Sequence, residues 1–225
     1  MIFNGDTLDH FEGPGVHPNS DRLIAEVLET CPARCGPPEL LSGNHDPAVS
    51  STSWAYIPTS QTLIFHGDCI SDCTHPSKID DQILKVRLEQ QWRKLGARPV
   101  KFIELADIYR GIQRQHFLEH PQRLEQPDTI RYLMSSIYPP IRIYHILDYW
   151  RKAPQRAAAL AATFAEPVRT VVFGHTHQAG RWTVNGMTIL NTGSFMPLST
   201  PYAVILDGPK VYFEKLSVLL RAFRL

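Results

Sequence analysis

Four short strings in this sequence combine glycine with side chains that bind metal ions or move protons. The strings are Asn4-Gly5-Asp6, Gly43-Asn44-His45-Asp46, His66-Gly67-Asp68 and Gly174-His175-Thr176-His177. Carboxylate, amide and imidazole ligands without a thiolate suit Mn²⁺, Fe, Zn²⁺ or Co²⁺ better than Ca²⁺ or Cu(I). The strings therefore predict a divalent-metal site with the ligands Asp6, Asn44, His66, His175 and His177.

Short apolar runs stand before three of these strings. They cover residues 40–41, 62–65 and 170–173, and a glycine follows each within two residues. Such runs are typical of buried strands in an α/β sheet. Because ligands bind at the carboxyl ends of strands in open α/β folds, we expect the strings to converge on one cleft. In a turn after a strand, His175 and His177 both reach a metal although they stand two residues apart.

Hairpins and helices complete the expected elements. Asn185-Gly186 predicts a type I′ turn between strands at 182–184 and 187–190, and Asp207-Gly208 predicts a hairpin between 202–206 and 210–216. Apolar residues at three- and four-residue steps predict a helix over 78–95. Prolines, among them Pro154, delimit further expected helices at 101–119, 127–137, 141–152 and 154–165.

Charge is divided unevenly along the chain. Residues 78–156 carry 15 basic and 9 acidic side chains, whereas the rest carries 8 and 13, so balances of +6 and −5 give the net +1. A basic segment inside an acidic frame is typical of an insertion that meets an anionic ligand, but also of a solvated helical surface. Both interpretations stay open. The near-neutral total argues against a dedicated nucleic-acid binder.

The composition is that of a globular protein, with 225 residues, 43% hydrophobic and 20% charged. No apolar run approaches the ~18 residues that a membrane span needs. Acidic residues follow the start from Asp6 onward, where a signal peptide would be basic and then apolar, so we expect a cytoplasmic protein. Reduced thiols are expected for the two C-x-x-x-C pairs, Cys31/Cys35 and Cys69/Cys73, and a zinc site is the alternative.

In this order the strings resemble the signature of the calcineurin-like metallophosphoesterases, which shows G-D, G-N-H-[DE], H-G and G-H-x-H. The resemblance covers residues 2–75 and 168–216. It implies an α/β fold, a β-sandwich of mixed sheets flanked by helices, in a single domain 1–225 with residues 76–166 as a helical insertion or cap. The layout also resembles the UDP-2,3-diacylglucosamine hydrolase branch, in which an inserted helical cap covers a lipid-nucleotide substrate.

The resemblance also implies a role for each residue. Asp6 resembles the carboxylate that bridges two divalent metals (Mn, Fe or Zn), and His177 resembles a ligand of the first metal. The residues that resemble the remaining ligands of the second metal are Asn44, His66 and His175. His45 resembles the histidine that stabilises the transition state or protonates the leaving oxygen while a metal-bound hydroxide attacks phosphorus. Three neighbouring carboxylates are expected to orient imidazoles, or else to cap strand ends: Asp9, Asp46 and Asp68.

One string of the family is absent, because no D-x-H precedes Asp6 and the first β-α unit is missing. We expect a fragment or a late start codon of an active enzyme. A relative that binds metal or phosphate without turnover, or a site completed by a partner, is the alternative. The expected substrate is a phosphorylated small molecule, a nucleotide or a lipid-linked phosphate. The apolar segment Leu216–Leu225 is expected to pack on the domain rather than on an anionic membrane.

Overall fold

The computed structural model describes residues 1–8, 18–29, 31, 37–70, 82–96, 100–119, 141–195 and 199–218. The helices and the short 3₁₀ helix η2 are α1 (Pro18–Glu29), η2 (Asp68–Ile70), α2 (Gln82–Leu95), α3 (Phe102–Glu119) and α5 (Ile141–Ala161). The strands are β1 (Ile2–Phe3), β2 (Glu39–Leu40), β3 (Trp54–Ile57), β4 (Thr62–Phe65), β5 (Thr170–Phe173), β6 (Gly180–Val184), β7 (Met187–Asn191), β8 (Tyr202–Asp207) and β9 (Lys210–Lys215).

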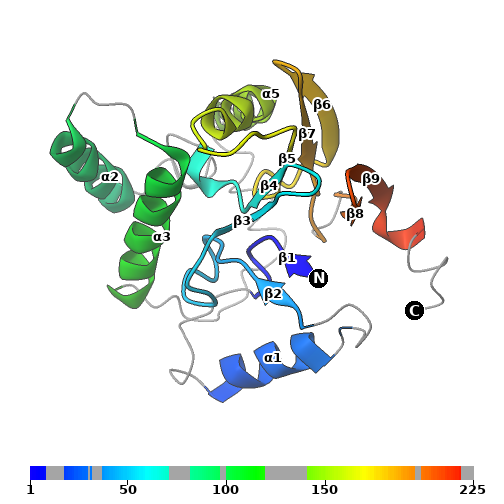
Figure 1. Cartoon of the computed structure of the whole chain (residues 1–225). Helices are drawn as coiled ribbons and strands as arrows, with labels where there is room; N and C mark the ends of the chain where they lie inside the picture. Colours follow the sequence, from blue (N-terminus) through cyan, green and yellow to red (C-terminus); the bar gives the residue numbers. More distant parts are fainter. Residues whose placement is uncertain are drawn as a thin grey trace.

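The centre of the molecule is a mixed sheet of five strands in the order β3-β4-β5-β7-β6 (Figure 1). Its three middle strands β4, β5 and β7 run parallel, and the edge strands β3 and β6 run antiparallel to their neighbours. Every residue of β4 and β5 is buried, which accounts for their continuous apolar sequences. The parallel arrangement brings the carboxyl ends of β4 and β5 to one edge of the sheet.

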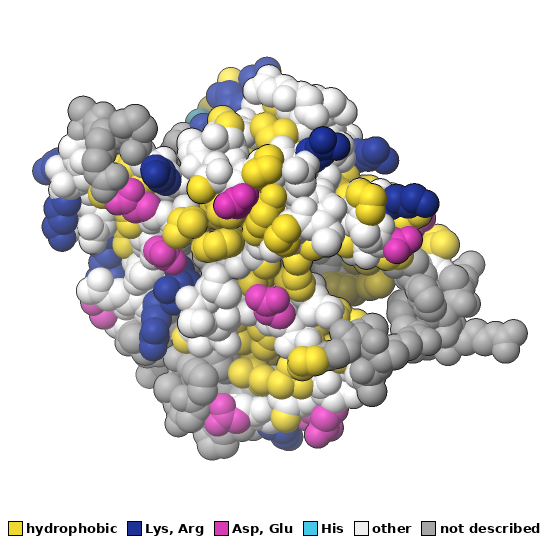
Figure 2. All heavy atoms as spheres, in the orientation of Figure 1, with side chains coloured by type: hydrophobic (Ala, Val, Ile, Leu, Met, Phe, Trp, Pro, Cys, Tyr) yellow, Lys and Arg dark blue, Asp and Glu magenta, His cyan; other side chains and the backbone are white. Residues whose placement is uncertain are grey.

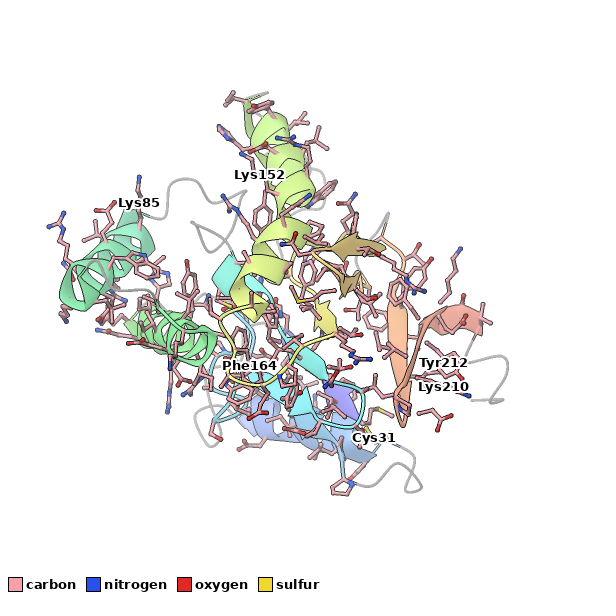
Figure 3. The ribbon with its side chains drawn as sticks, turned by 45° about the horizontal axis from the view of Figure 1, so that its top comes forward. Cys31, Lys85, Lys152, Phe164, Lys210 and Tyr212 are labelled. Carbon is pink, nitrogen blue, oxygen red and sulfur yellow. The ribbon has the colours of Figure 1, made fainter. Side chains whose placement is uncertain are left out.

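Helices cover one face of this sheet. Phe65 and Phe173 of the sheet share a core with Phe102 of α3 and with Ala153 and Ala157 of α5. Figure 3 shows Phe164 on the loop that follows α5, where its ring lies against Trp54 and Phe102. Although α3 and the second half of α5 lie inside the segment predicted as an insertion, they form the helical layer of the main core.

The two smaller sheets lie against the opposite face. Strand β1 pairs in parallel with β2, and β8 pairs antiparallel with β9. Leu41, which follows β2, is fully buried and shares a second core with Ile64 and Val172 of the central sheet. Val204 of β8 and Phe213 of β9 pack against the same cluster. The architecture is therefore mixed α/β, with helices on one face of a five-stranded sheet and short strands on the other.

Most predicted elements are confirmed. The runs at 62–65 and 170–173 are β4 and β5, and helix 101–119 is α3. The hairpin between β6 and β7 turns at Asn185 and Gly186, whose φ angles of 50° and 78° are those of a type I′ turn. Helix α2 lies within the range 78–95, of which residues 78–81 lie outside the described part. The helix predicted at 127–137 lies entirely outside the described residues.

The predicted break at Pro154 is wrong, because α5 runs through it from Ile141 to Ala161. Proline removes one backbone donor from a helix and crowds the preceding turn. On either side of Pro154, Ala153, Ala157 and Ala158 are buried against the sheet. The packing of this small-residue face stabilises the helix enough to offset the local cost. Strand β3 and helix α1 were not predicted.

Two of the four cysteines lie in the described part of the chain. Cys31 and Cys69 carry free thiols, and Cys35 and Cys73 lie outside the described residues. Burial raises the pKa of the Cys69 thiol well above its ordinary value, with a further contribution from the carboxylate of Asp68. Among the helices described, none is long and apolar enough to cross a bilayer. The segment 216–225 is described only as far as residue 218.

Candidate metal centre

Four side-chain donor atoms meet where β1, β2, β4 and β5 end. Nε2 of His66 lies 3.1 Å from Oδ2 of Asp6, 2.9 Å from Oδ1 of Asn44 and 3.1 Å from Nδ1 of His175. Oδ1 of Asn44 also lies 2.9 Å from Nδ1 of His175. Each donor comes from a different string, so the structure brings four of the five predicted ligands to one point.

The orientation of His66 shows what this point requires. Its Nδ1 lies 3.2 Å from the backbone carbonyl of Asn4, which only accepts hydrogen bonds, so Nδ1 carries a proton. In a neutral imidazole Nε2 then presents a lone pair to the oxygens of Asp6 and Asn44, which also present lone pairs. A cation at the centre removes this repulsion. A tetrahedral ion with ligands at about 2.1 Å separates them by about 3.4 Å, a few tenths of an ångström wider than observed.

Electrostatics also favours positive charge at this point. The pKa of Asp6 lies well below its ordinary value, since the charges of His66 and His45 outweigh the opposing effect of burial. Burial alone lowers the pKa of His66, but the carboxylate of Asp6 overrides this effect and raises it to about 9. In the absence of a metal, a proton on His66 supplies the positive charge that the cluster stabilises. The four side-chain donors and the electrostatic field around them therefore both fit a divalent cation.

Left-handed backbone and close contacts shape the loops of the site. Asp6, His175 and His177 have φ angles of 49°, 59° and 60°, a region that non-glycine residues seldom occupy. A Cβ on Gly43 would lie 2.2 Å from Oδ1 of Asp6, and a Cβ on Gly5 would lie 2.6 Å from Nδ1 of His66. Glycine is therefore required beside Asp6 and Asn44, because at Gly5 and Gly43 the chain passes too close to other atoms of the site for a side chain.

Two further residues of the predicted site lie beside the cluster: His177, predicted as a ligand, and His45, predicted as the catalytic histidine and not as a ligand. The group of donors within 4.8 Å of one another contains Asp6, His66 and His175, without His177. Burial lowers the pKa of His177; the charge of Asp6 opposes this shift, and the charges of His66 and His45 add to it. His45 donates its backbone N–H to Oδ1 of Asp6 at 2.8 Å. Both imidazoles thus lie within the electrostatic field of the site.

The neighbouring carboxylates differ in what they touch. Asp46 was predicted either to orient imidazoles or to cap strand ends. Its fully buried carboxylate accepts hydrogen bonds from four backbone N–H groups in the loops after β1 and β2, as the second alternative describes: those of Asp6, Thr7, Leu8 and Gly43. Burial and the charge of Asp6 raise the pKa of Asp46 to about 6, against the effect of these donors. Burial also raises the pKa of Asp68, and the charge of His66 opposes the shift. Asp9 lies outside the described residues.

Sequence reasoning missed three residues that support the site. Asn191, at the end of β7, donates to the carbonyl of Gly174 at 2.9 Å and to Oγ1 of Thr176 at 2.7 Å, and so holds the turn that carries His175. The same signal as for the other strings, a polar residue after a buried strand, points to it. The carbonyl of Asn4 and the ring of Tyr149, perpendicular to His175 at 6.4 Å, carry no such signal.

No family model matches the chain, and no curated protein matches it. The resemblance to metallophosphoesterases stays a prediction from the four strings.

Proposed function

We propose that this protein is a metal-dependent phosphoesterase with a metallophosphoesterase-like fold, which hydrolyses a phosphomonoester, phosphodiester or pyrophosphate bond. The convergence of Asp6, Asn44, His66 and His175 on one point carries the proposal. Two carbonyl or carboxylate oxygens and two imidazole nitrogens suit Mn²⁺, Fe or Zn²⁺. When bound, such a cation offsets the charge of the phosphate and lowers the pKa of a water molecule.

The chain's own residues would divide the remaining work. The four ligands hold the cation, and the carbonyl of Asn4 keeps Nε2 of His66 directed toward it. His45, anchored through its backbone N–H to Asp6, supplies an imidazole next to the ligands. An imidazole within reach of a leaving oxygen can donate a proton to it as a general acid. His177 stands nearby as a candidate ligand of a second ion.

Hydrolysis of bis-p-nitrophenyl phosphate with added Mn²⁺ tests the proposal. We expect Mn²⁺-dependent release of p-nitrophenol, lowered more than about 100-fold by Asp6→Asn and by His66→Ala, since even outer-shell losses cost about 10–100-fold. The matched controls are Asp148→Asn and His145→Ala on α5, both outside the cluster, and they keep wild-type rates. If the wild-type protein binds Mn²⁺ but hydrolyses neither this diester nor p-nitrophenyl phosphate, the proposed activity is wrong.

A metal-binding protein without turnover is the second candidate. The observation in its favour is that the described residues form one cluster of three or more His, Cys, Asp or Glu donors, and His177 lies outside it. This candidate expects one tightly bound ion per chain by elemental analysis and no hydrolysis. Two ions per chain together with turnover would exclude it.

The substrate is proposed as a phosphorylated small molecule, a nucleotide or a lipid-linked phosphate, and the location as cytoplasmic. Figure 2 shows Lys and Arg side chains over α2 and α3 on one face of the molecule. Several basic residues of the basic segment 78–156 pair with acidic residues of the same segment, as Arg87 does with Glu119 and Lys152 with Asp148. These pairs favour the solvated helical surface over an anion-binding one, so the substrate proposal rests on the metal cluster alone.

A further inference from the structure

Two loops of the metal centre hold each other through their carboxylates. The loop after β1 donates the backbone N–H groups of Asp6, Thr7 and Leu8 to the carboxylate of Asp46, at 2.8–3.1 Å. In return, the loop after β2 donates the N–H of His45 to Oδ1 of Asp6 at 2.8 Å. We call this pair of contacts the reciprocal clasp.

The clasp determines which oxygen of Asp6 faces the cluster. Oδ1 is engaged by the N–H of His45, and Oδ2 is the oxygen that lies 3.1 Å from Nε2 of His66. The φ of 49° at Asp6 is a conformation that persists only where its surroundings fix it. Three consecutive N–H donors on one carboxylate supply that fixation, because charge-assisted hydrogen bonds are about twice as strong as neutral ones.

The fourth donor connects the clasp to its own loop. The N–H of Gly43 donates to Oδ1 of Asp46 at 2.8 Å, which closes the turn that carries Asn44 and His45. Asp46 is fully buried, and the side-chain hydrogen bonds that it makes to the described residues all come from backbone N–H groups. Its carboxylate therefore acts on the backbone of two ligand-bearing loops at once.

We infer that Asp46 is a positioning residue of the metal centre, which sets metal affinity by fixing the backbone and the carboxylate of Asp6. The inference rests on the proposed function only in that the cluster binds a divalent cation. This role differs from a purely electrostatic one, in which the negative charge of Asp46 would attract the cation directly. A purely electrostatic role would act on the cation whether or not Asp6 is present.

A double-mutant cycle with Co²⁺ separates these roles. Co²⁺ affinity and the visible absorption spectrum of the bound ion are measured for wild type, Asp46→Asn, Asp6→Asn and the double variant, with Asp148→Asn as control. We expect Asp46→Asn to weaken Co²⁺ binding at least about 10-fold and to change the spectrum. If Asp46 acts through Asp6, the double variant binds no more than about 2-fold more weakly than Asp6→Asn alone.

The outcomes are distinct. If wild type binds no Co²⁺, the metal centre itself is wrong and the inference falls with it. If wild type binds Co²⁺ and folded Asp46→Asn binds it equally well, or if the two losses add, the inference alone is overturned. Circular dichroism of the metal-free variants establishes folding. Should Asp46→Asn not fold, Asp46→Glu keeps the negative charge but displaces the carboxylate by one methylene group from its four backbone donors; a wild-type affinity and spectrum in that variant would overturn the inference.

Discussion

At the scale of single residues, His66 is where a proton and the proposed metal ion would compete. The carboxylate of Asp6 outweighs the effect of burial and raises the pKa of His66 to about 9, so this imidazole is protonated at neutral pH when no metal is bound. Metal binding requires the deprotonated form. Between pH 9 and pH 7 we therefore expect the affinity for Mn²⁺ to fall about tenfold for each unit of decreasing pH.

Calorimetric titration with Mn²⁺ in buffers of different ionisation enthalpy measures this competition. At pH 7.5 we expect close to one proton to be released per ion bound. His145→Ala, on the exposed part of α5, should release the same number. An affinity that stays constant from pH 7 to pH 9 would show that His66 is already deprotonated in the metal-free protein.

How far the site could be predicted also depends on single residues. Asp6, Asn44, His66 and His175 could be predicted because four glycine-containing strings follow one another in this order, whereas each string alone also suits an ordinary turn. The carbonyl of Asn4 could not be found, since every residue carries one and only the folded chain shows which of them faces Nδ1 of His66. His177 has the right type and spacing, but the cluster leaves it outside.

At the scale of elements, the strands that bear ligands were predictable because they are buried on both faces. The sequences of β4 and β5 are continuously apolar or β-branched, and the structure buries every residue. Strand β3 has no such signal, as Trp54 and Tyr56 are only half-buried at the sheet edge. Pro154 misled the helix prediction because local propensity is a weak guide where a face of small residues packs on a sheet.

Two glycines should respond in opposite ways to alanine. A Cβ on Gly43 would come within 2.4 Å of the backbone nitrogen of Asp6, whereas a Cβ on Gly111, inside α3, would meet nothing within 4 Å. Gly43→Ala must push the two ligand loops apart, so we expect weaker metal binding and lower stability. Gly111→Ala gains helix propensity and should stabilise the protein by about 0.5–1 kcal/mol.

Urea unfolding and Mn²⁺ titration of both variants check this prediction. Gly111→Ala serves as the matched control, because it makes the same chemical change and should keep wild-type metal affinity. Normal metal affinity in Gly43→Ala would mean that the loops can separate without moving Asp6.

At the scale of the whole molecule, the same architecture explains both the core and the site. Parallel strands β4 and β5 end at one edge, and the parallel pair β1–β2 brings its own loops to that edge (Figure 1). Helices α3 and α5 pack behind it, and Tyr149 of α5 reaches the ring of His175. The segment predicted as an insertion therefore packs against the proposed metal centre, which sequence periodicity alone does not reveal.

The stability of the metal-free molecule should depend on pH through the cluster. His66 has a folded pKa of about 9 against an ordinary 6.5, so its contribution is complete below pH 6.5 and is lost as pH rises through 9. Asp46, with its pKa raised to about 6, acts between pH 3.8 and 6 and does not affect this window. We expect the free energy of unfolding to fall by about 2–3 kcal/mol between pH 7 and pH 9.5.

Urea titrations of the chelator-treated protein measure this fall, and His66→Gln, which cannot be protonated, should flatten most of the slope. An unchanged slope in this variant would mean that the pH dependence comes from other groups. The stability data would then give no evidence for a buried cluster that favours positive charge in the metal-free protein.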